Sequence, residues 1–117
     1  MNAQDRKELQ ALVLRLRTEA NLLRDENFSK TEEEVRNILT DISDEVLEKA
    51  EAEHEKFDNM TDSLQESDRG QAIQEAADGL SSITWPDVSD FDLTSMEDRE
   101  SLADDIDEAA DEIEGLL

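Results

Sequence analysis

The chain of 117 residues contains no cysteine, no tyrosine, one histidine, one tryptophan and one proline. The absence of cysteine excludes a disulfide scaffold, a thiolate metal site and a cysteine nucleophile. With a single histidine and no cysteine, the chain has few of the residues from which the usual catalytic triads are built. Its three glycines form no phosphate-binding loop. Carboxylates are so common that no pair stands out as acid and base. We therefore predict a protein that is not an enzyme and holds no cofactor.

Two further kinds of site are missing from the sequence. A calcium-binding EF-hand loop needs a glycine at position six and a glutamate at position twelve, and no loop starting at Asp87 or Asp90 provides both. Apolar runs are only a few residues long, so no segment is expected to span a membrane. The first residues lead into no signal-like apolar core, which predicts a cytoplasmic protein. The missing EF-hand pattern predicts that the protein has no metal site.

The dominant feature of the composition is negative charge. Acidic residues number 34 against 11 basic ones, which gives a net charge of −23. This charge repels nucleic acid and anionic membrane surfaces, so a direct partner of either kind is excluded and a basic protein is favoured. The charge is also uneven, because residues 1–30 carry a net +1 whereas residues 87–117 carry a net −12. Such asymmetry is typical of an interaction surface.

Apolar residues recur with helical spacing, which predicts an all-α protein. Leu9, Leu12 and Leu16 belong to a stripe on a first helix at 3–26, and Thr31 to Glu34 reads as a capping box that opens a second helix. The short break between them indicates a long antiparallel hairpin. We divide the chain into this hairpin at 1–58, expected to serve as a dimerisation unit because its stripes are long, and an acidic helical region at 59–117.

The second half is predicted to hold two shorter helices separated by a loop. The first of these starts at Ser63 or Asp68 and ends before Pro86, because the residue before a proline avoids helical geometry. Residues 84–94 form the loop, and a second capping box from Thr94 to Glu97 opens the last helix. The arginines of the first helix are expected to pair with acids of the second helix: Arg15, Arg17 and Arg24.

The acidic last helix is the main candidate for a binding surface. Its net charge amounts to about one per 3 Å of helix, close to the 3.4 Å per phosphate of one DNA strand. Five of its ten acids are aspartates, whose short side chains hold charge near a fixed backbone. The alternative is a merely solvated face. The ten residues are Glu97, Asp98, Glu100, Asp104, Asp105, Asp107, Glu108, Asp111, Glu112 and Glu114.

The loop at 84–94 contains two of the four phenylalanine and tryptophan residues of the chain, Trp85 and Phe91. Aromatic residues are enriched among the side chains that dominate protein interfaces, so this pair is a candidate anchor for a partner. The alternative is that both rings fold back over the helices and fill the core.

One stretch resembles known proteins. The sequence EKFDNMTDSLQ at 55–65, followed by SDRGQA at 67–72 and EAAD at 75–78, resembles a segment of small acidic proteins encoded by phages and prophages. In general character the chain is similar to phage DNA-mimic inhibitors. The resemblance implies an inhibitor that occupies the DNA-binding groove of a host enzyme, such as a restriction enzyme or CRISPR effector. The alternatives are a coiled-coil-like adaptor or assembly chaperone, and a binder of a basic protein such as an RNA polymerase subunit.

Overall fold

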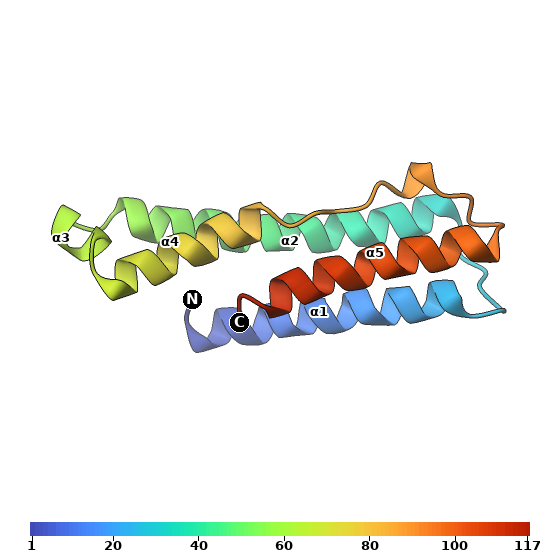
Figure 1. Cartoon of the computed structure of the whole chain (residues 1–117), viewed down its shortest axis with the longest axis horizontal. Helices are drawn as coiled ribbons and strands as arrows, with labels where there is room; N and C mark the ends of the chain where they lie inside the picture. The colour runs from blue at the N-terminus through green and yellow to red at the C-terminus, as the bar shows by residue number, and fades with distance from the viewer.

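The computed structural model describes residues 1–117, which form helices and no strand. Two long helices, α1 (Ala3–Arg24) and α2 (Glu32–Asp58), run in opposite directions along the molecule (Figure 1). They are followed by α3 (Asp62–Gln65), α4 (Asp68–Ser81), the 3₁₀ turn η1 (Val88–Asp90) and α5 (Met96–Glu114). The prediction of an all-α protein is confirmed.

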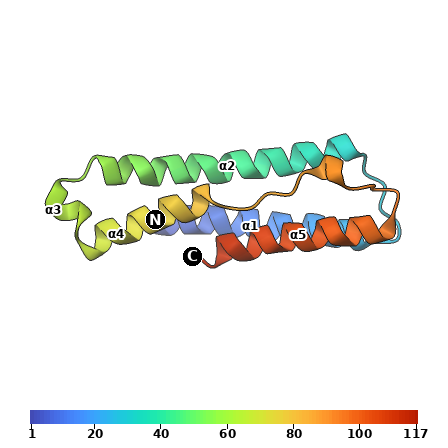
Figure 2. The ribbon, with the colours of Figure 1, turned by 45° about the horizontal axis from the view of Figure 1, so that its top comes forward.

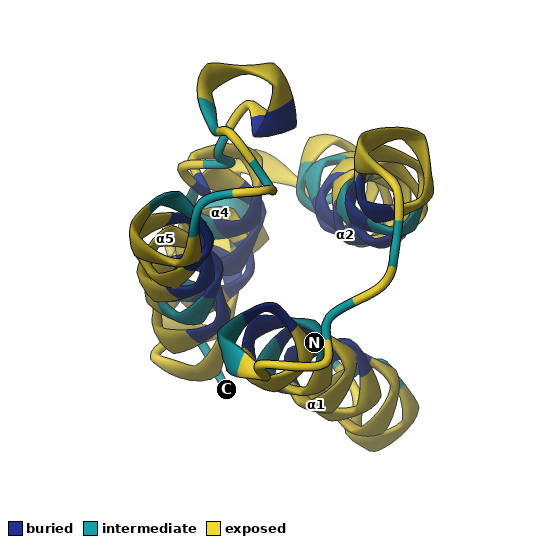
Figure 3. Ribbon diagram, turned by 90° about the vertical axis from the view of Figure 1, so that its right-hand side faces the viewer, coloured by how far each residue is buried: buried dark blue, intermediate teal, exposed yellow.

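The two C-terminal helices lie one after the other along the long axis and complete a narrow bundle. Helix α4 packs on α2, and α5 packs on α1, as both side views show (Figures 1 and 2). Seen along the axis, α1, α2 and α5 occupy three corners (Figure 3). The result is a rod with extents of 54 × 22 × 18 Å. Helices α1 and α2 therefore pack mainly against α5 and α4, and less against each other.

A single core joins residues 1–58 to residues 59–117. It contains 20 buried apolar residues, drawn from α1, α2, α4, α5 and the loop before α5. The stripe of α1 is covered within the chain, since Leu9, Leu16 and Leu23 have no exposed area. A second copy is thus not needed to cover the stripes of the two long helices, contrary to the reason for which we expected the hairpin to dimerise.

The helix starts follow the local sequence, with one correction. Thr31 caps α2, and its hydroxyl accepts a hydrogen bond from the Glu34 amide at 3.1 Å, as predicted. The cap of α5 is Ser95, one residue later than predicted, and it accepts from the Asp98 amide at 3.3 Å. Thr94 instead donates its hydroxyl to Asp92 Oδ1 at 2.6 Å. This local turn competes with the capping position and shifts the start of the helix.

The predicted third helix is divided into α3 and α4. Ser67 caps α4 and accepts from the Gly70 amide at 3.1 Å, which matches the later of the two predicted starts. Gly70 is required by close approach, because a Cβ there would lie 2.2 Å from the backbone oxygen of Leu64. Helix α4 ends at Ser81, before Pro86 is reached, and the following chain buries Ile83 and Val88.

Candidate functional site

Two arginines of α1 bind part of the acidic face of α5. Arg17 Nη2 lies 2.8 Å from Asp111 Oδ1 and 2.7 Å from Glu114 Oε2. Arg24 Nη2 lies 2.8 Å from both Asp104 Oδ1 and Asp107 Oδ2. The hydrogen bonds to these carboxylates raise the pKa of both arginines. Four of the ten predicted binding residues are therefore engaged within the molecule, where the two arginines offset two of their four negative charges.

The predicted partners of the arginines are thus corrected. Arg15 alone meets an acid of α2, with Arg15 Nη1 3.9 Å from Glu45 Oε1 and both side chains half-exposed. Arg17 and Arg24 instead pair with α5, because α5 lies alongside α1 over most of its length. Sequence periodicity cannot indicate this, since the arginines and their partners are 80 or more positions apart.

The other six acids of α5 divide into two groups. Asp98 accepts a hydrogen bond from the Asp92 amide at 2.8 Å, and Glu112 accepts one from the Thr84 amide at 2.9 Å. These two carboxylates hold the ends of the loop at 84–94 against α5. The remaining four are exposed and have no ion-pair or hydrogen-bond partner in the chain: Glu97, Glu100, Asp105 and Glu108.

A second acidic surface lies on α2 and was missed in the sequence analysis. We call it the α2 stripe: six exposed carboxylates at alternating spacings of three and four residues, with no ion-pair or hydrogen-bond partner. The stripe lies on the helix face opposite the buried residues Leu39, Ile42 and Val46. Its spacing is visible in the sequence, so it could have been found there. Its members are Asp41, Asp44, Glu48, Glu51, Glu55 and Asp58.

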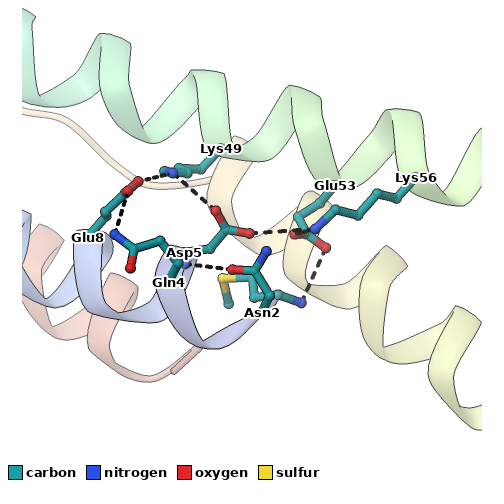
Figure 4. Close-up of polar contacts among 8 residues, drawn as sticks. Asn2, Gln4, Asp5, Glu8, Lys49, Glu53 and Lys56 are labelled. Carbon is teal, nitrogen blue, oxygen red and sulfur yellow. Dashed lines mark hydrogen bonds and ion pairs between the residues drawn. The ribbon is translucent and has the colours of Figure 1, made fainter.

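The cations of α2 do not reach this stripe. Lys49 Nζ lies 3.1 Å from Asp5 Oδ1 on α1 and also pairs with Glu8 (Figure 4). Lys56 Nζ lies 2.8 Å from Glu53 Oε1, which is buried and also receives the N-terminal amine at 3.3 Å. Both lysines are thereby directed toward the face that packs on α1. Arg36, the remaining cation, pairs with Glu32 at 3.4 Å, so no lysine or arginine of α2 is left to neutralise the stripe on the opposite face.

These contacts shift the pKa values of the groups in the network. Partial burial raises the pKa of Asp5, but the hydrogen bond and charge of Lys49 and the charge of Lys56 lower it by more, so the net pKa lies below the ordinary value. The hydrogen bond to Glu8 raises the pKa of Lys49, and the hydrogen bond to Glu53 raises that of Lys56. The network favours the charged forms and fixes one end of α2 against α1.

The predicted aromatic anchors do not form a cluster. Trp85 and Phe91 are each half-buried and pack against the core from the loop at 84–94. Phe91 lines a cleft of about 540 Å³ together with Phe28 and Arg99. Trp85 instead lines a separate hollow of about 290 Å³ over α2. The two rings therefore line different hollows at the surface.

The burial of the charged residue Arg99, which lines the cleft beside Phe28 and Phe91, is explained by its contacts. It is 9% exposed, and its Nη1 donates to the backbone oxygen of Asp25 at 3.1 Å. Its guanidinium carbon lies 5.1 Å from the centre of the Phe28 ring. Asp25 is the C-terminal cap of α1, where a cation is favoured by the helix dipole. Arg99 thus fastens the end of α1 and the following loop to α5, although its Nε has no partner.

No protein-family model, curated protein or solved structure matches the chain. No group of three or more His, Cys, Asp or Glu side chains is arranged to hold a metal ion. None of the helices combines the length and the apolar character needed to cross a bilayer. The unpaired carboxylates of α2 and α5 remain as the candidate functional surface.

Proposed function

We propose that this protein is a non-catalytic DNA mimic, which inhibits a DNA-handling or defence protein by occupying its basic DNA-binding groove. The observation that carries the proposal is the α2 stripe, an ordered row of carboxylates that no cation of the chain neutralises. A groove built to bind phosphates offers lysine and arginine side chains, which bind carboxylates as well.

The charge density of the rod supports this function. The net charge of −23 along a 54 Å axis corresponds to one charge for about every 2.3 Å. Duplex DNA carries one charge per about 1.7 Å of axis. The stripe from Asp41 to Asp58 spans about 25 Å at 1.5 Å per residue, so its six charges recur about every 5 Å.

The rigidity of α2 also supports mimicry. The helix has 27 residues, and buried side chains hold it to the bundle from Val35 to Glu53. Charges fixed on such a helix need not be ordered when a partner binds, so less conformational entropy is lost. Association with a basic groove would be steered by long-range attraction and weakened by salt.

The alternative functions have weaker support. An adaptor or assembly chaperone needs an apolar groove for its client, but Trp85 and Phe91 pack against the core of their own chain. A binder of a basic protein such as an RNA polymerase subunit would use the same carboxylates. It would differ from a DNA mimic because duplex DNA would not compete for its partner.

A capture experiment with charge-matched variants tests the proposal. The immobilised protein is exposed to nuclease-treated host lysate at low and high salt, and captured proteins are then challenged with duplex DNA. The stripe variant replaces four carboxylates by amides: Asp44→Asn, Glu48→Gln, Glu51→Gln and Glu55→Gln. We expect this variant to bind the partner at least about tenfold more weakly at low salt, because electrostatic steering is lost.

The control changes the same amount of charge on the other surface: Glu97→Gln, Glu100→Gln, Asp105→Asn and Glu108→Gln. We expect a smaller loss from the control, since these residues lie away from the α2 stripe. If Trp85→Ala abolishes capture in a folded protein while the stripe variant binds like the parent, apolar contact drives recognition. The adaptor function would then replace the DNA mimic.

A further inference from the structure

Most of the basic side chains are paired with acids of the chain, but two unpaired ones lie together. Seven of the eleven lysines and arginines form ion pairs with carboxylates. Among the other four, Arg99 binds the end of α1, whereas Arg6 and Arg69 line one hollow. In a chain with 34 acids, two guanidinium groups without a carboxylate at the same place need an explanation.

The hollow beside Arg6 and Arg69 is lined by no acidic side chain. It has a volume of about 410 Å³ and lies where the start of α1 approaches α2 and α4 (Figures 1 and 2). Lys56 of α2 is its third cation. Ile73 of α4, which is only 6% exposed, belongs to its apolar wall. The hollow thus combines three positive charges with an apolar surface.

The backbone adds to the positive potential of this hollow. Arg6 is the fourth residue of α1 and Arg69 is the second residue of α4, so both lie near the N-terminal ends of their helices. The helix dipole makes this end positive, which favours a bound anion and disfavours a cation. Arg69 is exposed and has no hydrogen-bond or ion-pair partner in the chain, so its position does not serve the stability of α4.

We propose that this hollow binds a small phosphate monoester. Its phosphate group has three terminal oxygens, which can accept hydrogen bonds from Arg6, Arg69 and Lys56 at once, whereas a carboxylate has only two. Present contacts leave donors free, because Arg6 uses Nη1 for the Leu117 backbone oxygen and Lys56 uses two of its three donors. The volume lies within the range of about 300–1,000 Å³ typical of small-molecule sites, which leaves room for an organic group against Ile73.

Local charges outweigh the net charge of −23 at this hollow. Interactions between exposed charges are largely screened beyond about 8 Å at physiological ionic strength. The carboxylates that contact Lys56 are also bound by other cations, Asp5 by Lys49 and Glu53 by the N-terminal amine. The unpaired acids of α5 lie toward the end of the rod that is far from α4 (Figure 1). No residue of the hollow belongs to the α2 stripe, so this site and the DNA mimic can fail independently.

Isothermal titration calorimetry of the whole chain at constant ionic strength, balanced with chloride, tests the proposal. We expect one saturable site for glycerol 3-phosphate, weaker binding of inorganic phosphate and still weaker binding of acetate. Arg69→Gln is expected to raise the dissociation constant of the ester about tenfold or more, because a charge-assisted contact is lost. Arg15→Gln is the matched control, since Arg15 is half-exposed on α1, does not line the hollow and should leave binding unchanged.

Thermal melts separate loss of binding from loss of folding. Glycerol 3-phosphate should raise the Tm of the parent and of Arg15→Gln, but not that of Arg69→Gln. Without ligand, Arg69→Gln should be at least as stable as the parent, because a cation is removed from the start of α4. Absence of saturable binding, equal affinity for acetate, or an Arg69→Gln variant that binds like the parent would overturn the proposal. Equal affinity for inorganic phosphate would replace the ester by free phosphate as the ligand.

Discussion

The α2 stripe should destabilise the folded protein, and its removal should make the protein more stable. Neighbouring members of the stripe are three or four residues apart, which places like charges side by side on one helix. Replacing Asp44, Glu48, Glu51 and Glu55 by their amides removes all five neighbouring repulsions between Asp41 and Asp58. We expect the stripe variant to have a higher free energy of unfolding than the parent.

The size of the gain follows from the number of pairs. Each like-charged pair at this spacing costs about 0.2–0.5 kcal/mol, so five pairs amount to about 1–2.5 kcal/mol. For a domain of this size that corresponds to a rise in Tm of roughly 4 °C for each kcal/mol. The charges of the stripe are about 5 Å apart along the axis, so salt of about 1 M, with a Debye length of about 3 Å, should largely remove the gain.

Urea unfolding followed by circular dichroism measures the effect at low and high salt. A second comparison variant, different from the control used for capture, makes the same change in net charge at the paired carboxylates of α5: Asp104→Asn, Asp107→Asn, Asp111→Asn and Glu114→Gln. These carboxylates are held by Arg17 and Arg24, so their neutralisation should lower the free energy of unfolding. If the two variants shift stability in the same direction by the same amount, only net charge matters, and the distinction between free and paired carboxylates is refuted.

Three further changes test individual contacts: a close approach of the backbone, a buried arginine and an ion pair. Gly70→Ala should lower the free energy of unfolding by about 1–3 kcal/mol in urea titrations, because the new Cβ would overlap the Leu64 carbonyl. Arg99→Ala should cost a similar amount, about 1–3 kcal/mol, since the bond to Asp25 and the ring contact are lost, and Arg99→Lys should not restore it. Asp5→Asn should be less stable than the parent above about pH 4, and thermal melts should show the difference vanishing as pH falls through the lowered pKa of Asp5.

The proposed function predicts a conflict between binding and stability in the free carboxylates. A helix face that served only solubility would gain from lysines placed among its glutamates. On α2, Lys49 and Lys56 instead face α1, and the stripe keeps its repulsion. If the predicted cost in stability is measured, it would agree with the proposed function, because a basic groove would relieve this repulsion on binding.

Much of the fold could be predicted because the signals are local. The apolar spacing of α1 and α2, and the cap at Thr31, depend on residues within one or two turns of each other. The start of α5 was misplaced by one residue because Thr94 bonds to Asp92 instead of capping the helix. Two neighbouring hydroxyl residues offered equally good caps, and the sequence contains no means of choosing between them.

The sequence by itself determined the helical class, the net charge and the absence of cysteine-based chemistry, because composition and helical periodicity do not depend on packing. Only the tertiary structure decided which carboxylates are free. Asp111 and Glu48 look alike in the sequence, yet Asp111 is bound by Arg17 from a helix 94 residues away and Glu48 has no partner. That difference arises because α5 lies against α1, while the outer face of α2 lies against nothing.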